Sequence, residues 1–168
     1  MEDFKLAKDY SCEEKLEGCQ NFVGGQFWVC YQTVANVFGE KKAEDYLREL
    51  AKVTAEFEAE WVKSMWGKEF KNLEEITNCF DIIHKMVGMD SHWEWLEDKY
   101  KVYEKITRCP FYSTMPETIK RKDVCKIYCH PIGVEAYSRL NAEISREKHL
   151  CDGDPYCGCI IEWKGPRD

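Results

Sequence analysis

The stretch Cys151-Asp-Gly-Asp-Pro-Tyr-Cys157-Gly-Cys159-Ile-Ile-Glu-Trp163 decides how the end of the chain folds. Residues 152–155 have the composition of a turn, because Gly accepts positive φ, Asp bonds to nearby backbone and Pro ends a strand. The alternation after the turn predicts a strand over 156–164. Side chains on one face of this strand would be Cys157, Cys159, Ile161 and Trp163. Paired with residues 143–150, the strand closes the chain as a hairpin.

The composition predicts one soluble globular domain that spans residues 1–168. The chain has 168 residues, of which 44% are hydrophobic and 33% charged, and its net charge is -7. This balance argues against disorder and against a general attraction to nucleic acid or anionic membranes. No apolar run approaches the roughly 20 residues that span a bilayer. The polar N-terminus contains no apolar signal core, so we expect a cytoplasmic protein.

Ten cysteines are many for a protein of that compartment. Disulfides are disfavoured there, so the thiols are expected to be packing groups, reactive groups or metal ligands. Five disulfides in an exported protein are the minor alternative. Cys12 and Cys19 lie two turns apart on one side of a helix. We interpret them as a packing pair in preference to a second metal or redox site.

The first half of the chain is predicted to be helical, over residues 1–88. A polar helix or arm covers 3–20, Gly24-Gly25 breaks the pattern, and a buried helix covers 26–38. The helix over 41–66 is expected to bury Tyr46, Leu50, Val53, Phe57, Trp61 and Met65. A further helix over 73–87 begins at the N-cap Asn72, with Glu75 as capping-box partner. Its inward residues would be Leu73, Ile76, Phe80, Ile83 and Met86.

The second half, residues 89–168, is cysteine-rich and predicted to form a sheet. Strands are expected over 91–96, 100–107, 143–150 and 156–164. A helix over 116–128 is inserted, Pro131 and Gly133 interrupt it, and a helical turn follows at 135–140. The fold class is therefore α+β, with N-terminal helices packed on an antiparallel meander of about four strands.

Four cysteines form the best candidate site. Cys125 and Cys129 share one helix face, while Cys109 and Cys157 come from a loop and from the closing hairpin. Four thiolates suit zinc or a [4Fe–4S] cluster, and the spacing leans slightly toward the cluster. Packing of reduced thiols is the alternative. Cys151 and Cys159 are reserve ligands, and His130 points roughly 100° away from the pair.

Other chemistries have less support in the sequence. There is no phosphate-binding glycine loop, nucleophile elbow or H-E-x-x-H helix, which argues against nucleotide-dependent and serine-hydrolase chemistry. A nucleophilic pair of Cys109 or Cys157 with His130 or His149 is weaker than the metal site. Three groups are interpreted as packing, capping or turn residues: Cys79 and His84; Asp123; and Asp152 with Asp154.

Several short motifs over residues 66–163 resemble the L-2-amino-thiazoline-4-carboxylic acid hydrolase-like family. They are Arg108-Cys109-Pro110-Phe111, Asp123-Val124-Cys125 with Cys129, Leu140-Asn141, and Gly153-Asp154-Pro155-Tyr156-Cys157. The hairpin is also similar to that of 4-vinyl reductase domains. The resemblance implies an α+β fold and hydrolytic opening of a small ring that contains sulfur and nitrogen.

Two functions are therefore expected. The first is a cysteine-ligated metal or iron–sulfur protein that acts on a small heterocycle. The alternative is a non-catalytic module that senses a metal, a redox state or a small ligand. In either function the partner is a small molecule and not a nucleic acid.

Overall fold

The computed structural model describes residues 11–115 and 125–167. Three helices come first: α1 (Cys12–Phe38), α2 (Glu40–Trp66) and α3 (Leu73–Val87). The strands β1 (Asp90–Glu97) and β2 (Lys101–Arg108) and the short helix α4 (Pro110–Ser113) follow. A π-helical turn, η1 (Cys125–Cys129), then leads into α6 (His130–Ser138). The chain ends with β3 (Ala142–Lys148), a 3₁₀ turn η2 (Leu150–Asp152) and β4 (Cys157–Trp163).

The four strands form one antiparallel sheet in the order β1-β2-β4-β3. The predicted fold class and the closing hairpin of β3 and β4 are confirmed. The meander was wrong, because β4 lies between β2 and β3 instead of at an edge. β4 is the strand with Cys159, Ile161 and Trp163 buried, and a central position covers such side chains best.

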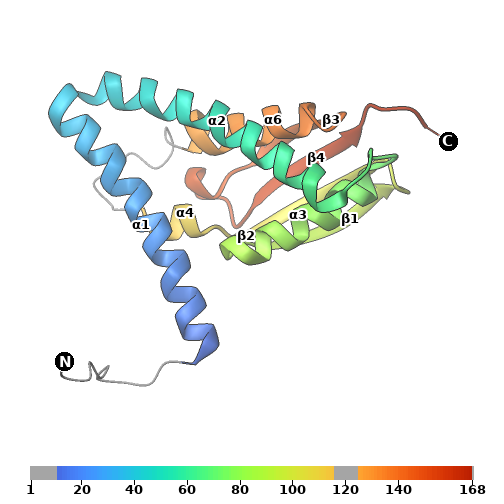
Figure 1. Cartoon of the computed structure of the whole chain (residues 1–168), viewed down its shortest axis with the longest axis horizontal. Coiled ribbons are helices and arrows are strands. Elements are labelled where there is room, and N and C mark those ends of the chain that lie inside the picture. Colours follow the sequence, from blue (N-terminus) through green and yellow to red (C-terminus); the bar gives the residue numbers. More distant parts are fainter. Residues whose placement is uncertain (1–10, 116–124, 168) are drawn as a thin grey trace.

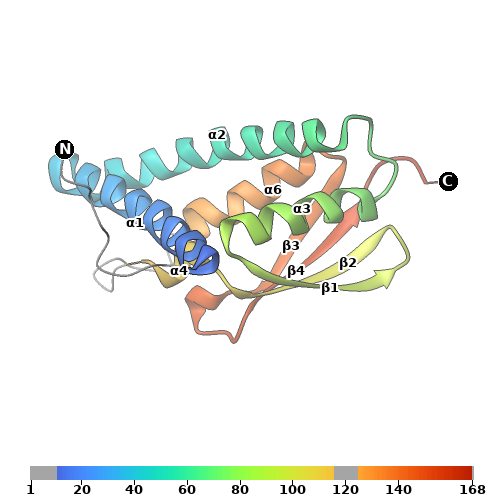
Figure 2. The ribbon, with the colours of Figure 1, turned by 60° about the horizontal axis from the view of Figure 1, so that its bottom comes forward.

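The helices lie on one face of the sheet and form two further layers (Figures 1 and 2). α3 and α6 lie against the sheet, and α2 runs over both of them. α1 packs against α2 and α4 (Figure 1). Its N-terminal half also reaches the end of α3, where Gln20 donates a hydrogen bond to the carbonyl oxygen of Met86, and the end of β2, where Glu17 pairs with Arg108. The core therefore lies between the sheet and the helices.

The buried face of α2 differs from the predicted one. The buried residues are small, apart from Leu47 and Val62: Ala43, Leu47, Ala51, Ala55, Ala59 and Val62. Of the residues expected inside, Leu50, Trp61 and Met65 are partly buried against the core, whereas Tyr46, Val53 and Phe57 are 36%, 65% and 64% exposed. The row of buried alanines, which we call the alanine stripe, lets the α2 backbone approach α6 closely. α2 therefore turns its small side chains, and not its largest apolar ones, toward the neighbouring helix.

Enlarging the alanine stripe should destabilise the protein. Ala55 is fully buried, so Ala55→Leu is expected to lower the free energy of unfolding by about 1–3 kcal/mol. Val53→Thr on the exposed face of the same helix is the matched control and should change it by less than about 0.5 kcal/mol. Urea unfolding of both variants checks the result, and equal losses would contradict the assigned face.

Two predicted interruptions are absent. α1 continues through Gly24-Gly25, because Gly24 lets Thr114 pack against the helix: a Cβ at Gly24 would lie 2.6 Å from Thr114 Oγ1. Pro131 and Gly133 lie inside α6. Pro131 occupies the first turn of that helix, where no intrahelical hydrogen bond is lost.

The start and the buried face of α3 are largely as predicted. Asn72 caps the helix by accepting a hydrogen bond from Glu75 N at 3.1 Å. Glu75 itself accepts from Lys71 N, so the second half of the predicted capping box is replaced by a neighbouring contact. Met86 is 53% exposed instead of buried. The part of the predicted 116–128 helix before Cys125 lies outside the described residues.

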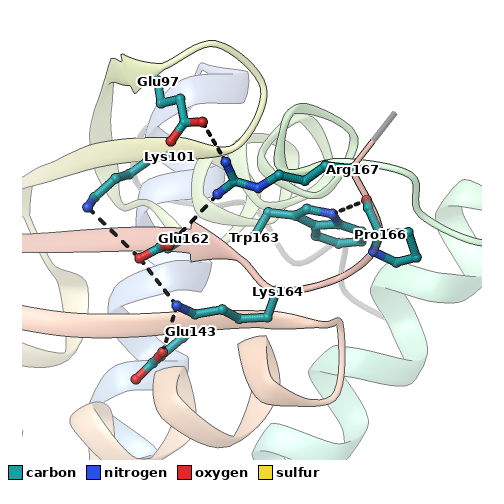
Figure 3. A network of polar contacts seen from close by, with 8 residues as sticks. All are labelled: Glu97, Lys101, Glu143, Glu162, Trp163, Lys164, Pro166 and Arg167. Atoms are coloured by element: carbon teal, nitrogen blue, oxygen red, sulfur yellow. Dashed lines mark hydrogen bonds and ion pairs between the residues drawn. The ribbon is translucent and has the colours of Figure 1, made fainter.

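The sheet end nearest the C-terminus is tied by ion pairs (Figure 3). Arg167 bridges Glu97 on β1 and Glu162 on β4, at 2.6 and 3.9 Å. Lys164 joins Glu162 to Glu143 on β3 at 3.3 and 3.1 Å. These pairs are exposed and individually weak, but together they connect β1, β4 and β3.

Candidate functional site

A cavity of about 110 Å³ lies between α2, α6 and the sheet. Its wall contains the four cysteines that the sequence singled out: Cys109, Cys125, Cys129 and Cys157. Cys109 caps α4, Cys125 and Cys129 begin and end η1, and Cys157 begins β4. The fold therefore brings thiols from three separate elements to one space, as expected.

The thiols contact one another and the backbone. Cys125 is hydrogen-bonded to Cys129 and to Cys151. Cys157 Sγ accepts a hydrogen bond from Leu150 N at 3.3 Å. Cys151 is buried but is not part of the cavity wall. Cys151, the reserve ligand, therefore contacts the Cys125 thiol from outside the cavity wall.

Burial keeps most of these thiols protonated at neutral pH. It raises the pKa of Cys109 to about 11 and that of Cys151 to about 12. The hydrogen bond with Cys129, followed by burial, raises the pKa of Cys125 strongly. Burial also raises the pKa of Cys157. A thiolate nucleophile is therefore a minor species at rest, because the reactive form of cysteine is the anion.

Across residues 11–115 and 125–167, no group of three or more histidine, cysteine, aspartate or glutamate side chains is arranged to hold a metal ion. The proposed ligand set remains a prediction. Cys12 and Cys19 are both exposed on α1, so the expected packing pair is wrong.

A row of three residues crosses the sheet beside the thiols. Glu104 on β2 pairs with Cys159 on β4, which in turn pairs with Arg146 on β3. Residues opposite one another on neighbouring strands point to the same face, so the three side chains lie together. Glu104 is 2% exposed and Cys159 fully buried, and the Cys159 thiol donates a hydrogen bond to Glu104 Oε2 at 3.3 Å.

Arg146 carries a positive charge beside the cavity. Burial alone lowers the pKa of its guanidinium, but nearby Cys159, Cys129, Cys157 and Glu104 raise it overall. Gly133 on α6 leaves room for it, since a Cβ at that position would lie 3.3 Å from Arg146 Nη2. The guanidinium therefore stays charged in a largely enclosed position.

Three enclosed polar atoms in the cavity wall have unused hydrogen-bonding capacity. They are Glu104 Oε1, Tyr137 Oη and Arg146 Nε. Within the part of the chain that the structure describes, none of them has a hydrogen-bond partner. Buried polar groups are nearly always satisfied, so these atoms are available to bind water or a ligand with complementary groups.

Glu58 and His84 complete the charged wall. Burial raises the pKa of the Glu58 carboxyl to about 7, although the neighbouring His84 lowers it. His84 Nδ1 lies 3.2 Å from Glu104 Oε1 and 3.1 Å from Ser91 Oγ. The hydrogen bond goes to Ser91, because only that contact has suitable geometry. A carboxyl group that titrates near pH 7 suits proton transfer.

The histidines of the predicted nucleophilic pair lie near the other end of the cavity. His149 lines it, with Nδ1 3.6 Å from Asp152 Oδ2. The His130 ring lies 6.3 Å from the His149 ring, and burial lowers the pKa of His130. His130 is not among the residues of the cavity wall. No hydrogen bond in the described residues joins either ring to Cys109 or Cys157.

Sequence reasoning missed the charged half of this site. Glu104 lies between Val102 and Ile106 on the same, buried face of β2, so a carboxylate among inward-facing apolar residues was a visible signal. His84 was interpreted as packing, yet it lines the cavity. Nothing in the sequence distinguishes Glu58 as a site residue, because α2 contains several other glutamates, among them Glu56 and Glu60.

Comparisons with known proteins agree with this architecture. The family model for L-2-amino-thiazoline-4-carboxylic acid hydrolase matches residues 23–160. No curated protein matches the chain. Of the helices that the structure describes, none combines the length and apolar character that a bilayer-spanning segment needs.

Two solved structures share the fold. One is a trafficking protein particle complex subunit 3 from Naegleria fowleri covalently bound to palmitic acid, with a TM-score of 0.58 and 14% identity over 86% of this chain and 96% of that chain. The other is the phenol-responsive sensory domain of the transcription activator PoxR with phenol, with a TM-score of 0.57 and 11% identity over 83% and 73%. At these identities the likeness concerns the fold alone. The match to the family model covers most of the chain, and the chain therefore belongs to the L-2-amino-thiazoline-4-carboxylic acid hydrolase family.

Proposed function

We propose that this protein hydrolyses a small carboxylate-bearing ring that contains sulfur and nitrogen, such as L-2-amino-thiazoline-4-carboxylate. The observation that carries the proposal is one cavity that contains three enclosed polar atoms, on Glu104, Tyr137 and Arg146, which form no hydrogen bond within the described residues. A volume of about 110 Å³ suits a ligand of roughly eight to ten non-hydrogen atoms.

Each charged group has a role in this reaction. Arg146 binds the carboxylate through its planar guanidinium. Glu58, in its ionised form, takes a proton from a water molecule, whose oxygen bonds to the ring carbon between sulfur and nitrogen. The C–S or C–N bond of the ring then breaks, and the proton passes to the leaving atom. Water is the favoured nucleophile, because burial raises the pKa of the Cys109 and Cys157 thiols and so keeps them protonated.

The test is direct. Purified protein is incubated with L-2-amino-thiazoline-4-carboxylate, and the small molecules are followed by mass spectrometry. We expect a product heavier by the mass of one water molecule, formed at a rate proportional to protein concentration. Binding without ring opening would instead favour a sensor module. The absence of both binding and turnover would contradict the proposal.

A second candidate function is a zinc or [4Fe–4S] protein. The observation that favours it is the convergence of Cys109, Cys125, Cys129 and Cys157 on one cavity. A centre with all four thiolates would be closed, whereas three thiolates would leave a position for water or substrate. The thiols must lose protons to bind a metal, so their raised pKa values weaken binding as the pH falls.

Metal retention provides the corresponding prediction. Protein made anaerobically with iron, sulfide and zinc supplied should retain metal, with brown visible absorbance for a cluster or no colour for zinc. Cys125→Ala should abolish metal retention, because Cys125 lies in the cavity wall and interacts with two other thiols, those of Cys129 and Cys151. Cys30→Ala removes an exposed thiol of α1 and is the matched control. Metal-free wild-type protein, or equal retention in both variants, would contradict the ligand set.

A further inference from the structure

We propose that His84 is a catalytic residue of this site, which carries the proton from Glu58 to the leaving atom of the ring. This inference rests on the proposed function. The reaction needs such a carrier, because Glu58 removes a proton from water, whereas the bond that breaks needs a proton at sulfur or nitrogen. An imidazole suits the task, since one of its nitrogens can accept and give a proton while a partner holds the other.

The contacts of Nδ1 orient the ring of His84. Nδ1 lies 3.1 Å from Ser91 Oγ and 3.2 Å from Glu104 Oε1. Both the His84 and the Glu104 side chains are largely buried, so water screens the contact between them little. A nitrogen lone pair that faced a carboxylate oxygen at this distance would be repelled, and the proton of the neutral ring therefore belongs on Nδ1. Nε2 then carries the lone pair that can accept a proton.

The second nitrogen of the ring is free to meet a ligand. His84 lines the cavity together with Glu58 and Glu104. Within the described residues Nε2 forms no hydrogen bond, and it is not one of the polar atoms that the protein encloses. Burial raises the pKa of the Glu58 carboxyl and the nearby His84 lowers it, so these two groups interact across the cavity. Nε2 is therefore the atom of His84 that can exchange a proton with Glu58 and with a bound ring.

Two aromatic rings hold the imidazole in this orientation. Trp93 from β1 stacks on it, with ring centroids 5.9 Å apart and an interplanar angle of 5°, and Phe80 lies at 5.9 Å and 48°. A histidine that only filled space would not need a buried carboxylate beside Nδ1, because burial of a carboxylate is costly. A buried carboxylate at one nitrogen and an open second nitrogen is the arrangement that holds a proton-transferring histidine in many enzymes.

The proton transfers balance over one turnover. Glu58 takes a proton from water as the water oxygen bonds to the ring carbon between sulfur and nitrogen. Glu58 passes that proton to Nε2 of His84, and the imidazolium gives it to the sulfur or nitrogen as the bond from that atom to carbon breaks. Glu104 stabilises the positive charge of the imidazolium between the two steps. Glu58 is then a carboxylate and His84 neutral again, so the only net change is the consumption of one water molecule.

His84→Gln tests the inference in the complete protein, with L-2-amino-thiazoline-4-carboxylate as the substrate. Proton transfer by a positioned side chain contributes about 10²–10⁴-fold, so we expect kcat to fall by at least about a hundredfold. KM and the calorimetric affinity should stay within about threefold of the wild-type values, because His84 is not proposed to bind the substrate. In His84→Ala, added imidazole should restore part of kcat, since it can enter the space left by the side chain and carry the proton.

His92→Gln, which replaces an exposed histidine of β1, is the matched control and should leave kcat unchanged. Turnover by wild-type protein with an unchanged kcat in His84→Gln would overturn the inference and leave the proposed function intact. A loss of substrate affinity that accounts for the whole loss of kcat/KM would also overturn it, because His84 would then only shape the cavity. If His84→Gln does not fold, His84→Asn and the imidazole rescue of His84→Ala provide the readout, and failure of the rescue would overturn the inference. Absence of turnover by wild-type protein would overturn both proposals.

Discussion

Replacing Glu58 by Gln is expected to lower kcat for ring opening by at least about a hundredfold. Gln has nearly the same shape but cannot take a proton from water. In the wild type, kcat/KM should rise as the pH increases through about 7, because the base acts in its ionised form and burial raises the pKa of Glu58 to that value. The variant should lose this rise. Steady-state kinetics between pH 5.5 and 8.5, within roughly 1.5 units of that pKa, measures both effects.

The same substitution has a second readout that needs no substrate. The folded protein binds the Glu58 proton more tightly than the unfolded chain does, so its stability falls as the pH rises from the ordinary glutamate pKa to about 7. At pH 8 the buried charge costs up to about 3 kcal/mol. Glu58→Gln should therefore be more stable than the wild type at pH 8 and not at pH 4.

Glu56→Gln, on the exposed side of α2, is the control for both measurements. Glu56 is exposed and forms a 3.8 Å ion pair with Arg139, so its loss should leave activity and pH dependence unchanged. A full pH profile in Glu58→Gln would show that another group is the base. Retained activity together with the stability gain would mean that Glu58 is buried for another reason.

Arg146→Gln is expected to weaken binding of carboxylate ligands by about a hundredfold or more. Removal of one partner of an enclosed charged pair typically costs about 2–5 kcal/mol, and the guanidinium is the only cation proposed to meet the carboxylate. Arg146→Lys should restore part of the affinity, because an ammonium keeps the charge but lacks the planar fork. Isothermal calorimetry with L-2-amino-thiazoline-4-carboxylate measures the series.

Arg139→Gln is the matched control for the arginine series. Arg139 is more exposed, at the end of α6, where it pairs with Glu135 at 2.9 Å. Its replacement should not change ligand affinity. Unchanged affinity in Arg146→Gln would exclude Arg146 from the carboxylate site. A loss that Lys does not repair at all would indicate a packing role instead of a charge role.

The sequence predicted the closing hairpin well but only part of the buried face of α2, since Leu50, Trp61 and Met65 pack against the core whereas Val53 and Phe57 do not. In β4, alternation of large apolar side chains has one solution, because a strand has only two faces. In α2, large residues such as Val53 and Phe57 and the small alanines all repeat at helical spacing. Hydrophobicity favours the large set, whereas close contact with α6 favours Ala51, Ala55 and Ala59, which are buried. That choice depends on the neighbouring helix and cannot be derived from α2 alone.

The site was predictable in part for a similar reason. Cysteines are uncommon enough to be noticed, and the four that were selected all reach the cavity. Glutamate and arginine are common residue types, so Glu104 and Arg146 do not stand out in the sequence. They are recognised as site residues only from the strand register, in which both pair with Cys159. Register between β3, β4 and β2 depends on β4 taking the central position. The predicted meander excluded that arrangement.

The attachment of α1 has a mechanical consequence. Gly24 packs against Thr114, and Trp28 Nε1 donates a 3.0 Å hydrogen bond to the carbonyl oxygen of Phe111. Phe111 is itself part of the cavity wall. α1 therefore supports the cavity wall from outside, at Phe111. Its first half is held in place as well, because Gln20 donates a 3.0 Å hydrogen bond to the carbonyl oxygen of Met86 and Glu17 pairs with Arg108 at 3.2 Å. A substitution on α1 that loosens these contacts would thus reach the site through its wall, although α1 carries none of the charged residues of the cavity.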